Sequence, residues 1–451
     1  MLITTKGLET NAKFNARAAG LEELKQVVLP MAAVPLKTEV EELNQLGKQT
    51  ADAVIETFCR ESVPSAGPKE VDEETTERVL QFSGDSYSTA LDNMEKYFLQ
   101  HHWSDGFPLV PPTQEAVNRM LEGTELPRDH VVGLVEPEGA AATIESIAIN
   151  AVMAGCLPQY MPVLIAAVEC VTDPRFDLRG IQGTSCSVSP LLVISGGKLI
   201  EQLNINDGFS AIGPGWKANA TIGRAIQLIM SNIGNVWPGR NDMTTLGSPL
   251  KYVMLLAENE SAYGGAWEPI RVAEGFDYAQ PTISAMPAIS WQPDHIPSVI
   301  ATVDKTLELI SLQGKVKYDR FAANFGLDNM VLLTPTAFEP IRLERRSRED
   351  IQKALYEAIQ LPCSEFFEDK EPSTEAGVQI QIPERIVEKC KANPQAFTPL
   401  LFGPESLKII VTGGPGPAML AYISTWGWGR AYFVMKPISL PKYWKGLLEK
   451  Y

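Results

Sequence analysis

Cys156 is the residue whose type and position in this sequence point most directly to chemistry. It lies between Gly155 and Pro158 in an almost uncharged stretch, TIESIAINAVMAGCLPQYMPVLIAAVEC, at residues 143–170. Glycine commonly ends a helix, and proline suits the first turn of the next one. We therefore expect Cys156 at the start of a second helix, where the helix dipole favours the thiolate. Such a thiolate is a candidate nucleophile or metal ligand. The alternative is a small, inert residue buried at a tight corner.

A second set of reactive groups lies in QHHWSDGFPLVPPT, residues 100–113. His101 and His102 end a predicted helix, and Asp105 lies in the turn that follows. Adjacent helical residues point about 100° apart, so both imidazoles cannot face one metal ion. We expect His101 to interact with the carbonyl groups at the helix end. His102 and Asp105 are candidate acids or bases.

A glycine turn precedes a predicted helix in GPGWKANATIGRAIQLIMSNIG. Gly213 and Gly215 allow close approach of a ligand to the backbone, Asn219 or Thr221 can cap the helix, and Arg224 follows in its first turns. Such a helix start favours an anion, here a carboxylate or phosphate ester of a small substrate. The spacing matches neither nucleotide motif. The alternative is a plain turn before an amphipathic helix.

Two carboxylates follow a predicted strand in LGSPLKYVMLLAENE. The strand carries Lys251 and ends in Glu258 and Glu260, which share one face because residues two apart in a strand do so. Paired carboxylates can hold a divalent metal, or one of them can be an acid with a raised pKa. The alternative is an exposed strand end.

A further glycine-rich segment, IIVTGGPGPAM, offers backbone N–H groups at Gly413 and Gly414 after an apolar strand. Such groups can bind an anion, although a lone glycine signal is weakly specific.

The elements that must position these groups alternate along the chain. We predict helices at 87–101, 113–122, 143–154, 158–171, 218–232, 296–312, 348–359 and 384–391, and strands at 130–135, 190–195, 251–257, 329–335 and 407–413. The strands are apolar throughout, which predicts an α/β or α+β layered domain with a buried sheet. We expect a small α/β unit at 1–62, a linker at 63–76 and the main body at 77–451. No repeat of fixed period is evident.

The composition excludes several classes of protein. The chain has 451 residues and a net charge of −16 without a long basic run, which argues against a nucleic-acid partner. Six cysteines lack C-x-x-C spacing, which argues against a zinc ribbon and a disulfide framework. Free thiols and the lack of a signal peptide predict a cytoplasmic protein. Pro158, Pro162 and Glu169 predict two short buried helices at 143–170 rather than a membrane span.

Several segments resemble a bacterial family associated with the UGSC-type (seleno)protein domain. They are WSDGFPLVPPT, TIESIAINAVMAGCLPQYMPVLIAAVE, ANATIGRAIQLI, LGSPLKY and AENE, and residues 14–60 resemble the tail of that domain. The redox-active segment of the domain is absent from this chain. The resemblance places the following residues in the family's motifs: Asp105, Asn150, Cys156, Asn219, Arg224, Lys251, Glu258 and Glu260.

Together these features predict an enzyme acting on a small anionic organic molecule, by carbon–sulfur or other carbon–heteroatom cleavage, as a lyase or hydrolase. Cys156 is the expected nucleophile, and the predicted proton-transfer groups are Glu258, Glu260, Asp105 and His102. The predicted substrate-binding residues are Arg224, Asn219, Lys251, Asn150, Gly213, Gly215, Gly413 and Gly414. The sequence identifies no cofactor. The alternatives are a ligand-presenting subunit of a UGSC-type redox protein and a carboxylate and histidine metalloenzyme. The expected partner is a small-molecule substrate, with a homo-oligomer or a UGSC-type partner chain as further possibilities.

Overall fold

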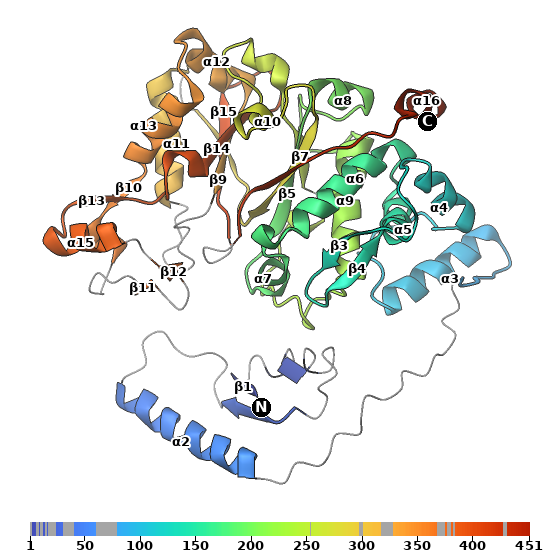
Figure 1. Cartoon of the computed structure of the whole chain (residues 1–451), viewed down its shortest axis with the longest axis horizontal. Helices are drawn as coiled ribbons and strands as arrows, with labels where there is room; N and C mark the ends of the chain where they lie inside the picture. The colour runs from blue at the N-terminus through green and yellow to red at the C-terminus, as the bar shows by residue number, and fades with distance from the viewer. Residues whose placement is uncertain are drawn as a thin grey trace. The chain divides into compact units, whose positions relative to one another are not determined.

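The chain divides into two compact units, residues 1–94 with 236–243 and residues 95–235 with 244–451 (Figure 1). The computed structural model describes residues 2–5, 9, 12–13, 16, 24–29, 40–59, 79–252, 254–296, 301–316, 328–367, 375–376, 380–381, 384–426 and 431–451. In the first unit, β1 (Leu2–Thr5) pairs in parallel with β2 (Gln26–Leu29), and α2 (Val40–Cys59) follows. The predicted linker at 63–76 lies outside the described residues.

Two four-stranded sheets form the centre of the larger unit. The first has the strand order β16-β7-β5-β6, and the second has the order β14-β9-β15-β8. The strands of the first sheet are β5 (Ser189–Ser195), β6 (Leu255–Ala257), β7 (Thr282–Ala288) and β16 (Val434–Pro437). Those of the second are β8 (Pro293–His295), β9 (Asn329–Leu333), β14 (Leu407–Val411) and β15 (Met419–Ile423). The predicted α/β or α+β class is confirmed.

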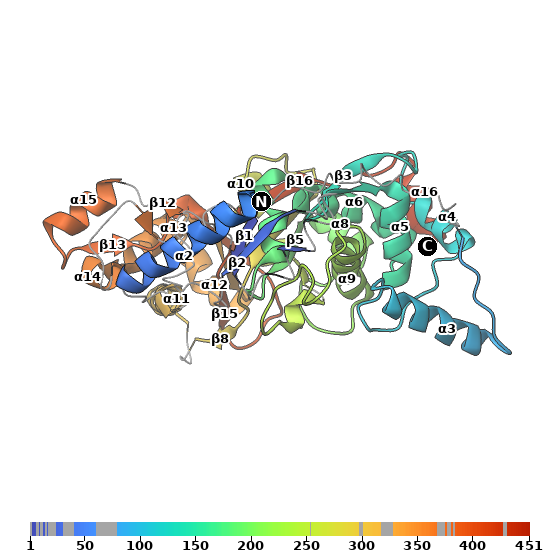
Figure 2. The same ribbon diagram turned by 90° about the horizontal axis from the view of Figure 1, so that it is seen from below.

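The two sheets pack face to face through one layer of apolar side chains. Alternate residues of β9 show the arrangement: Met330 and Leu332 join this inner layer, whereas Val331 and Leu333 face helices. Helices α6 (Met161–Val171) and α9 (Lys217–Asn232) cover the first sheet. Helices α11 (Val303–Val316), α12 (Pro335–Leu343) and α13 (Arg348–Ala358) cover the second (Figures 1 and 2). Both faces of each sheet are thus buried, which explains the uninterrupted apolar strands.

The larger unit contains an internal repeat of strand order. In each sheet a strand lies between a parallel neighbour and an antiparallel one: β5 between β6 and β7, and β9 between β14 and β15. The fourth strands are exchanged, because the chain passes from β7 to β8 in the second sheet and from β15 to β16 in the first. The sequence analysis missed this repeat, since equivalent positions share burial rather than residue type.

The hydrogen bonds after β7 and after β15, where the chain crosses to the other sheet, follow the same repeat. Ile289 N donates to Ser424 O at 3.0 Å, and Trp426 N donates to Pro287 O at 3.1 Å. The strand registers make Pro287 equivalent to Ser424 and Ile289 equivalent to Trp426. The two repeats are therefore joined by an equivalent pair of backbone hydrogen bonds at the points where the chain crosses between the sheets.

The uncharged stretch at 143–170 forms two short helices, as predicted. Helix α5 (Ile144–Ala154) ends at Gly155, which has a left-handed φ of 83°, and α6 begins at Met161. Both helices are largely buried. Among the described residues, no helix combines the length and apolarity that a membrane crossing requires.

The other elements extend this framework. The remaining strands are β3 (Val131–Val135), β4 (Ala140–Thr143), β10 (Gln360–Pro362), β11 (Glu375–Ala376), β12 (Ile380–Gln381) and β13 (Phe397–Pro399). The remaining α-helices are α3 (Tyr87–Gln100), α4 (Gln114–Leu121), α7 (Leu178–Gly183), α8 (Gly197–Gln202), α10 (Ile270–Ala273), α14 (Cys363–Phe366), α15 (Glu384–Ala392) and α16 (Trp444–Lys450). Short 3₁₀ helices are η2 (Pro158–Tyr160), η3 (Pro174–Phe176), η4 (Pro249–Lys251), η5 (Glu260–Tyr263) and η6 (Pro404–Ser406).

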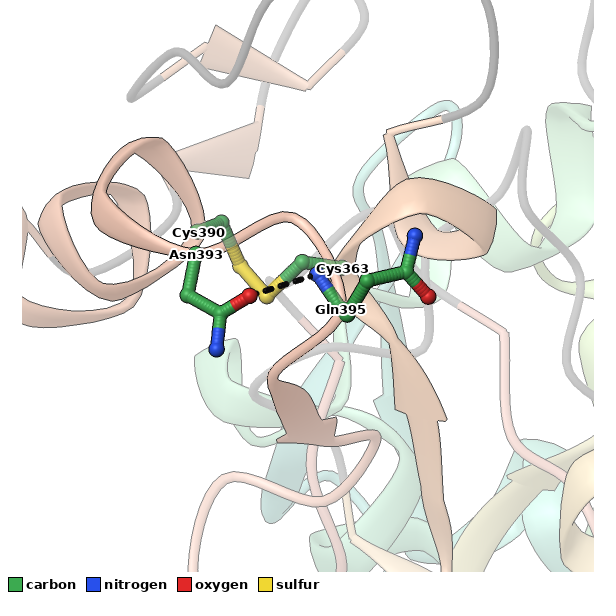
Figure 3. The surroundings of a disulfide bond; sticks show 4 residues. All are labelled: Cys363, Cys390, Asn393 and Gln395. Carbon is green, nitrogen blue, oxygen red and sulfur yellow. Dashed lines mark hydrogen bonds between the residues drawn. A yellow bond between two sulfur atoms is a disulfide. The ribbon is translucent and has the colours of Figure 1, made fainter.

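A disulfide joins Cys363 to Cys390 and so links α14 to α15 (Figure 3). The expectation that all six cysteines are free thiols is therefore wrong for these two. They lie 27 residues apart in sequence, a spacing that carries no motif. Beside the bridge, Gln395 N donates to Asn393 Oδ1 at 3.0 Å, which holds the turn after α15.

Candidate functional site

Cys156 lies in the bend between α5 and α6, but not at the start of an α-helix. Its backbone N donates to Ala151 O at 2.9 Å, which continues the end of α5. The 3₁₀ turn η2 separates it from α6. Its Sγ donates to Thr221 O in α9 at 3.3 Å. Cys156 thus directly precedes Leu157, the N-cap of the 3₁₀ turn that continues into α6, which is close to the predicted position.

Burial controls the protonation of Cys156. The residue is 8% exposed, and burial raises the pKa of its thiol to about 12, although the bond to Thr221 and the charges of Lys217 and Arg224 act in the opposite direction. The expected thiolate is thus corrected to a neutral thiol near neutral pH, because desolvation outweighs these favourable interactions.

The thiol forms part of the lining of a pocket of about 320 Å³. The other lining residues are Val110, Ala116, Arg119, Met120, Val152, Gly155, Leu157, Pro158, Lys217 and Tyr451. Most of this wall is apolar, and its two charged side chains are both cationic. The pocket therefore combines an apolar body, a thiol and positive charge.

The predicted glycine turn brings Lys217 to this pocket. Lys217 is the first residue of α9, and Trp216 at the N-cap provides no side-chain hydrogen bond to the helix. Gly215 has a left-handed φ of 109°, a conformation that suits glycine. Gly213 packs closely against Ser210, where an added Cβ would lie 2.8 Å from the Ser210 Cβ. The two glycines shape the turn, and neither belongs to the pocket lining.

Arg224 and Asp105, predicted for separate roles, form an ion pair with each other. Arg224 Nε and Nη2 donate to the two Asp105 carboxylate oxygens at 2.7 and 2.8 Å. Nη2 also donates to Phe107 O at 3.3 Å and Pro108 O at 3.1 Å. The arginine thus clamps the 105–108 loop, and neither member of the pair belongs to the pocket lining.

Asn219 and Asn150 have internal hydrogen-bond partners. Asn219 Oδ1 accepts from Asn206 N at 2.8 Å, and its Nδ2 donates to Ala211 O at 3.3 Å. Asn150 Oδ1 accepts from Asn232 Nδ2 at 2.6 Å. Both side chains are buried and tie neighbouring segments together, which is a positioning role.

The two histidines lie at the end of α3, as predicted. His101 Nδ1 lies 2.8 Å from Tyr97 O in the last turn, which matches the expected interaction with the helix end. His102 has a left-handed φ of 63° and a half-buried side chain outside the pocket lining.

Glu258 and Glu260 lie at the carboxyl end of β6, in a second cluster. Glu258 is fully buried and accepts hydrogen bonds from Ser195 Oγ, from Tyr263 OH at 2.6 Å and from Ile270 N at 2.8 Å. Burial raises the pKa of Glu258 despite these donors, as predicted for one carboxylate of the pair.

Arg271 connects the two carboxylates of this cluster. Its Nη1 donates to Glu260 Oε1 at 2.5 Å and to Ser195 Oγ at 3.0 Å. Gly196 N also donates to Glu260 Oε1, at 2.6 Å. Protein donors thus occupy both acids. Within the described part of the chain, no group of three or more His, Cys, Asp or Glu residues could hold a metal ion.

Lys251, predicted within a strand, lies instead in the 3₁₀ helix η4. The strand β6 begins at Leu255, and Lys251 Nζ donates to Thr244 Oγ1 at 2.7 Å. Lys251 is therefore separated from the pocket lining.

Gly413 and Gly414 join the second cluster to the loop before α9. Gly413 N donates to Asp207 O at 2.8 Å, and Gly413 O accepts from Asn259 Nδ2 at 3.4 Å. A Cβ on Gly414 would lie 2.5 Å from the Phe209 ring. These glycines serve close packing, and the Gly413 N–H is already bonded within the protein.

Sequence reasoning missed four residues of interest. Lys217, Arg119 and Tyr451 line the pocket, and only Lys217 had a signal, its place at a predicted helix start. The fourth is Asp207, whose pKa is raised by burial and by nearby carboxylates, including that of Glu260. No protein-family model and no curated protein matched the chain.

We predict that Asp105→Asn destabilises the protein. The side chains of Arg224 and Asp105 are 16% and 15% exposed, so loss of the carboxylate leaves a poorly solvated guanidinium at a cost of about 1–3 kcal/mol. Chemical denaturation measures this change in the free energy of unfolding. Glu339→Gln is the matched control, because its pair with Arg342 is more exposed, at 46% and 35% of the two side chains, and it should leave the midpoint nearly unchanged. Equal midpoints for all three proteins would contradict the clamp.

We also predict an unusual pH dependence for alkylation of Cys156. In a Cys59→Ser, Cys186→Ser background, its rate with a small neutral reagent should rise about tenfold per pH unit from pH 7 to 10, because the reactive thiolate fraction grows without saturating. An ordinary thiol with a pKa of about 8.5 levels off within this range. Peptide mapping by mass spectrometry measures the rate, and a plateau below pH 9 would show that the thiol is not desolvated.

Proposed function

We propose that the larger unit is an enzyme acting on a small anionic organic molecule with an apolar body, which binds in the Cys156 pocket. The observation that carries the proposal is the lining itself: six apolar side chains, a thiol and two cations, with no acidic side chain among them. An apolar wall with a few placed polar groups is typical of small-molecule sites.

The two cations of the lining favour an anionic ligand. The protein as a whole is acidic, with a net charge of −16. A local excess of positive charge therefore distinguishes this pocket from its surroundings. Lys217 makes no ion pair with any residue that the structure describes. Among the described residues, the ion-pair partner of Arg119 is the exposed Glu115, at 3.7 Å, and such pairs contribute little to stability. Both cations can accept a ligand anion at small cost.

The thiol suggests cleavage of a carbon–heteroatom bond. Cys156 Sγ forms a bond to the substrate carbon as the carbon–heteroatom bond breaks, and the thiol proton passes to the leaving heteroatom. Water then releases the product and restores the thiol. Proton transfer to the leaving group matters here because burial keeps the free thiol neutral. Glu258 and Glu260 belong to the separate cluster and take no part in this step.

The test uses protection of Cys156 by anions of graded size. Short aliphatic carboxylates, phosphate esters and sulfonates are added, and Cys156 modification by uncharged methyl methanethiosulfonate is followed. We expect protection by at least one class, and about tenfold weaker protection in Lys217→Ala because one charged contact is lost.

Lys198→Ala is the matched control for this test, since Lys198 is exposed and does not belong to the pocket lining. In Lys198→Ala, the anions should protect Cys156 as strongly as they do in the wild-type protein. The proposal fails if no anion protects Cys156, or if Lys198→Ala and Lys217→Ala weaken protection equally.

A further inference from the structure

The segment at residues 441–451, here called the strap, packs against the pocket. It contains α16, which contacts η2, the turn that begins two residues after Cys156. Tyr451 belongs to the pocket lining. Figures 1 and 2 both show α16 close to α4 and α5. One wall of the pocket thus comes from a segment far away in sequence.

Mostly exposed polar contacts hold the strap in place. Lys450 Nζ lies 2.5 Å from Glu122 Oε2, and Tyr451 OH donates to the same oxygen at 2.9 Å. Tyr443 OH donates to Thr124 O at 2.9 Å. Exposed contacts of this kind are individually weak.

The apolar anchoring of the strap is slight. Within the strap, two residues are buried, Pro441 and Leu447. Segments with few buried apolar contacts and exposed hydrogen bonds open locally at low free-energy cost. We therefore expect the strap to detach from the pocket and rebind while the rest of the fold stays intact.

The position of Glu122 links the strap to the charge of the pocket. Its pKa is lowered by hydrogen bonds from Lys450 and Tyr451 and by the charges of Lys450 and Arg119. Arg119 lines the pocket. When the strap is closed, Lys450 pairs with Glu122 and leaves Arg119 to a ligand anion. When the strap opens, the Glu122 carboxylate is free to compete for Arg119.

We propose that the strap is a gate over the Cys156 pocket, whose closure both encloses the ligand and preserves the positive charge that binds it. The proposal rests on the proposed function for the identity of the ligand. By linkage, an anion that binds better to the closed form must in turn favour closure.

The test measures how fast uncharged methyl methanethiosulfonate modifies Cys156 without any anion. In the Cys59→Ser, Cys186→Ser background, Lys450→Ala and Leu447→Ala should each raise the rate about tenfold. Lys445→Ala is the matched control, because Lys445 is exposed and forms an ion pair with Glu449 within the strap itself, and it should leave the rate unchanged. Cys170 lies on α6, is fully buried and donates its Sγ–H to Ile283 O of β7. It should stay unmodified in every variant and so reports an intact fold.

An unchanged Cys156 rate in both Lys450→Ala and Leu447→Ala, with Cys170 protected, would overturn the gate. A raised rate without protection by any anion would support the gate and reject the proposed function. Protection by anions, with an unchanged modification rate in both variants, would support the proposed function and reject the gate.

Discussion

Burial of one shared apolar layer between two sheets is the constraint on which the rest of the structure depends. Each central strand presents apolar side chains to both faces, one toward the opposing sheet and one toward helices. Polar groups are therefore displaced to the strand ends. Ser195 is the last residue of β5, Glu258 directly follows the parallel strand β6, and Thr412 directly follows β14. The exchange of β8 and β16 ties the two sheets together, so neither repeat completes its sheet alone.

This constraint separates two polar regions that the sequence presents as one list of candidates. The carboxyl ends of β5 and β6 hold Glu258, Glu260 and Arg271 in a closed hydrogen-bond network, which is typical of a structural anchor. The Cys156 pocket lies where α5, α9 and the strap meet, and its cations have no strong ion-pair partner among the residues that the structure describes. A cluster whose groups are already satisfied stabilises the fold, whereas unsatisfied charge beside an apolar cavity favours a ligand.

Local signals predicted much of the secondary structure. The left-handed Gly155 and the proline after it allowed the α5 and α6 helices to be placed within a few residues, and the continuous apolar runs predicted β5, β9 and β14. The strands β7 and β15 were missed. Strand β7 contains Pro287, which lowers its apparent strand character, and β15 follows directly on a glycine and proline run that reads as loop. Both are central strands, so tertiary burial outweighed local preference.

The site was less predictable, because its properties arise from contacts distant in sequence. Cys156, Arg224, Glu258 and Glu260 were predicted to serve one site, but the pocket beside Cys156 is lined by none of the other three. The two acids lie in a separate cluster with Ser195 and Arg271. The prediction of a thiolate at Cys156 was wrong. Burial by neighbouring elements raises the pKa of the thiol, and that burial cannot be inferred from one segment. Arg224 lies 119 residues from its partner, so its clamp role had no local signal.

The central claim is that the Cys156 pocket attracts anions through Lys217. The most direct measurement compares alkylation of Cys156 by anionic iodoacetate and neutral iodoacetamide, expressed as a ratio of rates. The account predicts a ratio above that of a small free thiol in the wild-type protein and a severalfold fall in Lys217→Ala. A ratio equal to that of the free thiol in both proteins would contradict it.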